Sequence, residues 1–137
     1  MANEIQKSTD VNAVDNNVVF CSMHADSVDD RIKVFNAINS SLALDDFVGK
    51  TLHVKDLVIQ PVELTNERTG EIEQSKRIVL IDVDGKAYAT VSKGVASAIR
   101  NIFAIIGVAP WDKPLKLKPV KRQGNHGFKY TTLEIEG

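Results

Sequence analysis

Residues 76–106 read KRIVLIDVDGKAYATVSKGVASAIRNIFAII. This stretch contains two runs rich in Ile, Val and Ala, residues 76–83 and 86–91, separated by Asp84-Gly85. Asp-Gly between two such runs is a strong signal for a hairpin with a two-residue turn. Residues 76–91 therefore predict a β-hairpin.

A helix is predicted directly after this hairpin. Ser92 can cap its first turn, and Gly107 can end it. The apolar residues between them recur at helical spacing: Val95, Ile99, Ile102, Phe103 and Ile106. The polar side of the same helix carries Lys93, Ser97, Arg100 and Asn101. Trp111 follows between two prolines, and we expect it to plug a barrel end rather than to stack on a base.

Upstream of the hairpin, residues 51–64 alternate apolar and polar side chains and shift phase at residues 55–57. A phase shift inside a long strand indicates a β-bulge, which lets the strand curve around a small barrel. Residues 65–75 are polar throughout and predict a loop.

Downstream of the helix, residues 115–120 alternate Leu with Lys and predict a strand. Residues 121–127 predict a basic loop, and residues 128–135 predict a last strand. From residue 51 onward the order is strand, strand, strand, helix, strand, strand. This is the order of the five-stranded OB barrel, a mainly β fold that binds oligonucleotides with the loops after its first and fourth strands. Here those are residues 65–75 and 121–127.

The amino-terminal part is predicted to be an extension of this barrel. Residues 1–17 predict a flexible arm, residues 18–20 a short strand, and residues 28–39 a helix capped by Ser27. We expect residues 18–137 to form a single domain, because the length and apolar content suit one core.

Charge is distributed unevenly along the chain. Residues 1–48 hold eight acidic and three basic residues, whereas the remainder holds fourteen basic and ten acidic residues. This asymmetry indicates a polyanionic partner for the basic part. The single cysteine, Cys21, excludes an internal disulfide, and no apolar run approaches the length of a membrane span. These features predict a protein of a reducing cytoplasm that does not enter a membrane.

The segment from residue 113 to residue 130 contains six Lys or Arg residues and no acidic residue. Lysines on the fourth strand and aromatics on the fifth would provide phosphate contacts and base stacking for single-stranded nucleic acid. A two-residue turn in the hairpin would place Arg77, Lys86 and Tyr88 on one outer face. The candidate DNA-binding residues are Lys55, Arg77, Lys86, Tyr88, Lys116, Lys118, Lys121, Arg122, His126, Phe128 and Tyr130.

Two structural alternatives remain open for these residues. Tyr88 could pack under a neighbouring loop instead of facing a base. The lysines could lie on a solvent-exposed edge strand and prevent it from pairing with another chain. The sequence shows no nucleophile–base pair, phosphate-binding glycine loop or metal-ligand spacing, so we expect no enzyme, no cofactor and no metal site.

The hairpin and helix of residues 69–107, with the following PW and PLKLKPV, resemble the single-stranded DNA-binding proteins of phages that infect Gram-positive bacteria. The resemblance covers residues 18–135. It implies an OB fold, cooperative coating of single-stranded DNA during phage replication or recombination in the host cytoplasm, and no cofactor. Phage replication or recombination proteins as partners, and a homo-oligomeric state, are left open.

Two other functions remain as alternatives. An OB-fold RNA-binding module would share nearly all of these features, and a phage structural or interaction protein could use the basic strip to contact an acidic partner.

Overall fold

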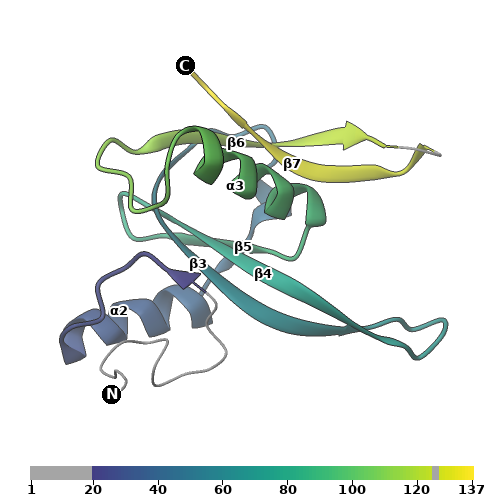
Figure 1. The fold of residues 1–137 in the computed structure, drawn as a ribbon, viewed down its shortest axis with the longest axis horizontal. Coiled ribbons are helices and arrows are strands. Elements are labelled where there is room, and N and C mark those ends of the chain that lie inside the picture. The colour runs from purple at the N-terminus through teal and green to yellow at the C-terminus, as the bar shows by residue number, and fades with distance from the viewer. Residues whose placement is uncertain (1–19, 125–126) are drawn as a thin grey trace.

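The computed structural model describes residues 20–124 and 127–137, so the predicted arm at residues 1–17 lies outside the described residues. The described chain is mainly β, with two α-helices and one 3₁₀ helix, η1 (Figure 1). The elements in chain order are β1 (Phe20–Cys21), α2 (Val28–Asn39), β2 (Leu42–Ala43), η1 (Leu44–Phe47), β3 (Leu52–Thr65), β4 (Ile72–Asp82), β5 (Ala87–Thr90), α3 (Lys93–Ile105), β6 (Leu115–Gln123) and β7 (Lys129–Ile135).

The strands form one curled sheet in the order β2-β5-β4-β3-β6-β7, with β1 paired to β3. All of these pairs are antiparallel except β2 with β5. In the described part of the chain β5 and β7 do not pair, and α3 lies between them, which makes the sheet a half-barrel. The prediction of a mainly β, barrel-like chain is confirmed at this level.

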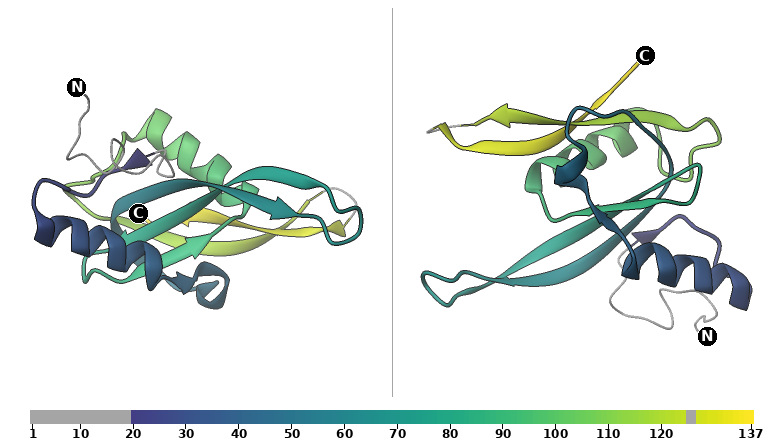
Figure 2. Two further views of the ribbon diagram at one scale, coloured as in Figure 1. Left: turned by 90° about the horizontal axis from the view of Figure 1, so that it is seen from below. Right: turned by 180° about the vertical axis from the view of Figure 1, so that it is seen from behind.

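Two long hairpins extend from the half-barrel on the same side, with α3 between them (Figures 1 and 2). We call their projecting parts the β3–β4 arm (residues 60–77) and the β6–β7 arm (residues 119–124 and 127–133). The predicted loop at residues 65–75 is wrong in its second half, because strand pairing continues as far as Thr65 opposite Ile72. Ile72 is the only apolar residue among residues 72–75, so the sequence shows no strand periodicity in this part of the arm.

The predicted bulge is confirmed in β3, where the register shifts between Val54 and Asp56. Before the shift, residues 52–54 pair with β6, and after it the strand pairs with β4 and, at Val58 and Ile59, with β1. The extra residue increases the local twist, so that one strand can serve both sides of the half-barrel.

The interior of the half-barrel is apolar. Leu57, Leu80 and Leu117 are fully buried there, and α3 covers them with Val95, Ile99 and Ile102. Trp111 packs against this cluster and donates its Nε1–H to the carbonyl oxygen of Gly107 at 3.0 Å, in agreement with its predicted role as a plug.

The turn of the β4–β5 hairpin differs from the prediction. It has three residues, 83–85, and Gly85 takes a positive φ of 88°, which favours glycine. The Asp82 carboxylate accepts hydrogen bonds from the backbone N–H groups of Asp84 and Lys86 and so holds the longer turn. Tyr88 is therefore opposite Leu80 rather than Ile81.

This one-residue change turns Tyr88 into the half-barrel, because a shift by one residue exchanges the two faces of a strand. The side chain of Tyr88 is 4% exposed. The predicted outward orientation is wrong. Ala87 and Ala89 lie on the opposite face, beneath α2.

Helix α2 has the predicted bounds, and the Ser27 hydroxyl accepts a hydrogen bond from the Asp30 backbone N–H at 3.1 Å. It packs on the outer face of β4 and β5 through Val34 and Ala37. The larger apolar residues that predicted the helix are exposed instead: Val28, Ile32 and Phe35. The helix therefore covers the outer face of β4 and β5 with small side chains.

Candidate nucleic-acid interface

Two predicted site residues belong to the fold. The Arg77 guanidinium donates to Gln60 Oε1 at 2.9 Å, to the Ile38 carbonyl oxygen at 3.1 Å and to Ser41 Oγ. A cation at the carbonyl end of a helix is stabilising, so Arg77 anchors the carboxyl end of α2.

Tyr88 is likewise occupied in the interior. Its hydroxyl donates to Asp82 Oδ2 at 3.2 Å, and its ring lies 4.8 Å from that of Phe47 in an edge-to-face arrangement. Burial, and then the charge of Asp82, raise the pKa of Tyr88 above its usual value of 10.0. Neither Tyr88 nor Arg77 offers a free surface to a ligand.

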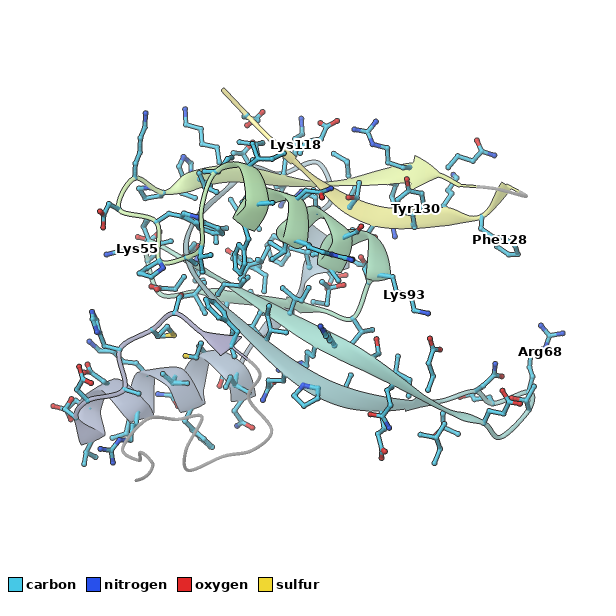
Figure 3. The ribbon with its side chains drawn as sticks, viewed as in Figure 1. Lys55, Arg68, Lys93, Lys118, Phe128 and Tyr130 are labelled. Atoms are coloured by element: carbon cyan, nitrogen blue, oxygen red, sulfur yellow. The ribbon has the colours of Figure 1, made fainter. Side chains whose placement is uncertain are left out.

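Lys86 and Lys55 lie at the end of the half-barrel opposite the arms. Lys86 directly follows the β4–β5 turn, and Val83 of that turn donates its N–H to the His53 carbonyl oxygen at the start of β3. Lys55 is at the bulge of the same strand, far from the arm tips (Figure 3). The predicted His126 lies outside the described residues.

Strands β6 and β7 bring four of the predicted residues onto one face. Lys116, Lys118 and Arg122 alternate along β6, and Tyr130 is directly opposite Arg122 on β7. Residues opposite each other in an antiparallel pair share a face. Lys116, Lys118, Arg122 and Tyr130 therefore share one face of these two strands.

The same pairing also introduces acidic residues. Glu134 is opposite Lys118 and forms an ion pair with Arg122, while the Glu136 N–H donates to the Lys116 carbonyl. Acidic residues in or directly after β7 therefore neutralise part of the positive charge that residues 113–130 carry. Exposed ion pairs of this kind contribute little free energy, so Arg122 can exchange Glu134 for a phosphate at small cost.

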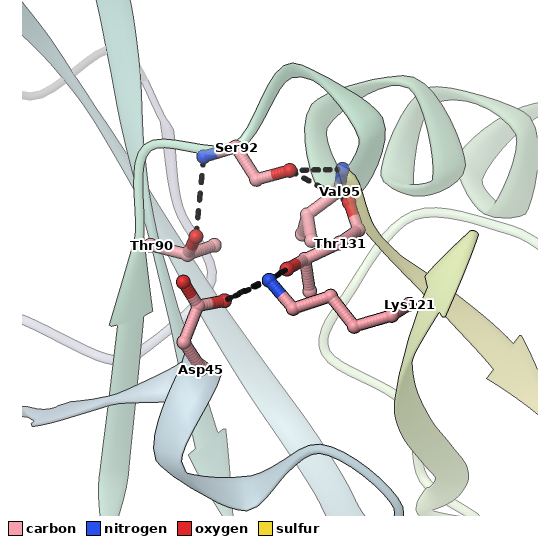
Figure 4. Close-up of polar contacts among 6 residues, drawn as sticks. All are labelled: Asp45, Thr90, Ser92, Val95, Lys121 and Thr131. Atoms are coloured by element: carbon pink, nitrogen blue, oxygen red, sulfur yellow. Dashed lines mark hydrogen bonds and ion pairs between the residues drawn. The ribbon is translucent and has the colours of Figure 1, made fainter. Parts of the chain in front are cut away.

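Lys121, a predicted DNA-binding residue, lies on the face of β6 opposite to that of Lys116 and Lys118. Its Nζ donates to Thr131 Oγ1 at 2.7 Å and is 3.8 Å from Asp45 Oδ1 (Figure 4). The Thr131 hydroxyl in turn donates to Asp45 at 2.8 Å, and Ser92 Oγ donates to the Thr131 carbonyl oxygen at 2.7 Å. These contacts join η1, α3 and the β6–β7 arm where β5 and β7 do not pair.

The two aromatic residues of the arm are accessible, as predicted. Phe128 is 74% exposed and Tyr130 is 43% exposed. The Tyr130 ring lies against Gly94 on α3 and Gly124 at the end of β6 (Figure 3). Because neither glycine has a side chain, the ring packs on backbone and keeps part of its surface open.

Helix α3 separates two grooves on this side of the molecule. The α3–β7 groove has a volume of about 690 Å³, and its lining includes Lys93, Ser97 and Tyr130. The α3–β4 groove has a volume of about 540 Å³, and its lining includes Lys76, Lys93 and Arg100. Lys93 therefore lies on the ridge between the two grooves.

Sequence reasoning placed Lys93 and Arg100 on the polar side of α3 but not in the site. The sequence gives no signal for this location, because only the packing of α3 between the two arms turns the polar side of α3 toward Tyr130. The β3–β4 arm has a slight excess of acidic residues, with Glu63, Glu67, Glu71 and Glu73 against Arg68, Lys76 and Arg77. The basic β6–β7 arm is thus the better anion-binding side of this face.

Within residues 20–124 and 127–137, no group of three or more His, Cys, Asp or Glu residues could hold a metal ion. No helix of the described chain is long and apolar enough to cross a membrane.

A protein-family model described as phage single-stranded DNA-binding protein matches residues 13–136. Its members are non-enzymatic DNA-binding proteins. No curated protein matches the chain, and no solved structure matches it.

Proposed function

The chain belongs to the family of phage single-stranded DNA-binding proteins, and we propose that it coats the strand without regard to base sequence. The strand lies on the face formed by the β6–β7 arm and α3. As a member of this family, the chain binds single-stranded DNA and is not an enzyme.

The observation that carries the proposed location is the exposed pair Phe128 and Tyr130 beside the cations of β6. Stacking on an aromatic ring is available to every base, and each nucleotide adds one phosphate for a cation. Lys116, Lys118 and Arg122 provide those cations from the same face as Tyr130. His126, adjacent in sequence to this group, is retained in the proposed site.

Lys55, Lys86, Arg77, Tyr88 and Lys121 are not part of the proposed site. Lys55 and Lys86 are at the far end of the half-barrel, and the other three side chains make the internal contacts described above.

We also propose that the half-barrel is an OB fold. The order β3, β4, β5, α3, β6, β7 and the neighbour sequence β5-β4-β3-β6-β7 support this assignment. In this assignment residues 18–137 form one domain. The chain would protect single-stranded DNA during phage DNA replication or recombination in the host cytoplasm. Its candidate protein partners are other phage proteins of those processes and further copies of the same chain.

A titration with labelled poly(dT) at increasing salt tests the proposed function. We expect log K to fall linearly with log salt, with a slope of roughly −0.7 for each phosphate neutralised. Lys118→Gln should make the slope shallower by about 0.7, whereas Lys113→Gln, in the connector before β6, should leave it unchanged.

A salt-independent affinity, or tighter binding to duplex DNA, would contradict the proposal. Tighter binding of matched poly(rU) would instead favour the RNA-binding alternative.

A further inference from the structure

The α3–β4 groove combines an apolar floor with a basic rim. Ile59, Ile78, Ile99 and Phe103 contribute to its floor, and the rim carries Lys76, Lys93 and Arg100. The Phe103 ring is supported from behind by the rings of Phe20, at 5.4 Å between centroids, and Trp111, at 6.1 Å. An aromatic surface held in this way loses little conformational freedom when a ligand stacks on it.

Two of the three cations at this rim have no partner within the described part of the chain. Lys76 and Arg100 are exposed, and neither side chain forms a hydrogen bond or an ion pair with the described residues. Lys76 precedes Ile78 by two residues, so it continues the inward face of β4 onto the β3–β4 arm, toward α3. The third cation, Lys93, contacts Glu73 of the same arm.

Resting on the proposed function, we propose that the α3–β4 groove is a second nucleotide-binding site for the same DNA strand. The strand passes from Tyr130 in the α3–β7 groove over Lys93 and places its next bases against Phe103. Lys76 and Arg100 hold the phosphates of that segment. An α-helix is about 10–12 Å across and bases in a duplex strand are about 3.4 Å apart, so crossing α3 takes about three nucleotides.

The chemistry of this groove fits a nucleotide segment better than a wholly apolar ligand. A base buries its faces on Ile and Phe side chains, while the attached phosphate remains at the rim with the cations. Lys93 can release Glu73 for a phosphate at small cost, because both side chains of that pair are more than half exposed.

The test compares Lys76→Gln/Arg100→Gln with the wild-type chain in poly(dT) titrations at several salt concentrations. We expect affinity to fall by about tenfold or more at 0.1 M salt and the salt slope to become shallower by about 1.4, the value for two phosphates. The melting temperature should not change, because both side chains are exposed and form no hydrogen bond or ion pair within the described part of the chain.

The matched control is Lys33→Gln/Lys86→Gln, which removes two positive charges from the groove between α2 and β5. It should affect affinity much less, because that groove is on the face that α2 covers. Equal effects of the two double variants would show that only net charge matters and would overturn the second site, as would wild-type affinity and slope in Lys76→Gln/Arg100→Gln. Failure of the wild-type chain itself to bind poly(dT) would instead reject the proposed function.

Discussion

Replacement of Tyr88 by alanine is expected to lower the free energy of unfolding by about 3–5 kcal/mol, as is typical when a buried aromatic side chain is truncated. The ring is 4% exposed and packs edge-to-face on Phe47 within the main apolar cluster. A loss of this size is a large part of the stability of a domain of this length, and denaturant unfolding would measure it directly.

Tyr88→Phe is the matched control, since it keeps the ring and removes only the hydroxyl that donates to Asp82. It should cost about 1 kcal/mol. Tyr88→Phe should also lose less folding stability at alkaline pH than the wild-type chain does. The pKa of Tyr88 is raised in the folded state, so the stability that the protonated hydroxyl contributes is fully present below pH 10.0. That stability is lost as the pH rises through the raised pKa. If Tyr88→Ala kept wild-type stability and lost only poly(dT) affinity, the three-residue turn would be wrong.

Gly94→Ala is the second substitution with a large expected effect. On an exposed helix, Gly→Ala stabilises by up to about 1 kcal/mol. At Gly94 the added methyl group would come 2.7 Å from Tyr130 Cδ2 and would also collide with the Thr131 carbonyl oxygen, which is backbone. We expect a loss of about 3 kcal/mol, at the upper end of the range for overpacking.

This substitution should also weaken DNA binding, because it displaces Tyr130 and separates α3 from β7. Ser97→Ala, one turn later on the exposed side of α3, is the control and should leave the melting temperature unchanged. Greater stability in Gly94→Ala would mean that β7 does not approach the helix so closely.

The features predicted correctly from the sequence are the ones set by neighbouring residues. Ser27 and Ser92 begin the two helices because their hydroxyls accept hydrogen bonds from backbone N–H groups three residues later. The bulge in β3 was visible because it shifts the phase of the apolar pattern. Such local signals require no knowledge of the tertiary structure.

The hairpin register was missed although its cause is also local. Asp84-Gly85 suits a two-residue turn, but the carboxylate of Asp82 favours the longer turn by accepting two backbone hydrogen bonds. One added residue was enough to bring Tyr88 inside and Ala87 outside. An aspartate two residues before Asp-Gly is the signal that could have corrected the prediction.

Other differences arise from long-range pairing. Glu134 is twelve residues from Arg122 in the sequence and is its ion-pair partner in the structure. Lys121 is separated from Lys118 by an odd number of positions, so strict alternation places it on the other face, beside Asp45. The site as a whole requires α3 between the two arms, and no pattern in the sequence specifies that packing.

The central claim is that single-stranded DNA lies on the face of Tyr130, and the most direct test is the affinity of Tyr130→Ala for labelled poly(dT). We expect a loss of about 1–3 kcal/mol of binding free energy, the value for one stacked base, with Tyr130→Phe binding like the wild-type chain. Wild-type affinity in a folded Tyr130→Ala protein would contradict the account and would place the DNA on another face of the half-barrel.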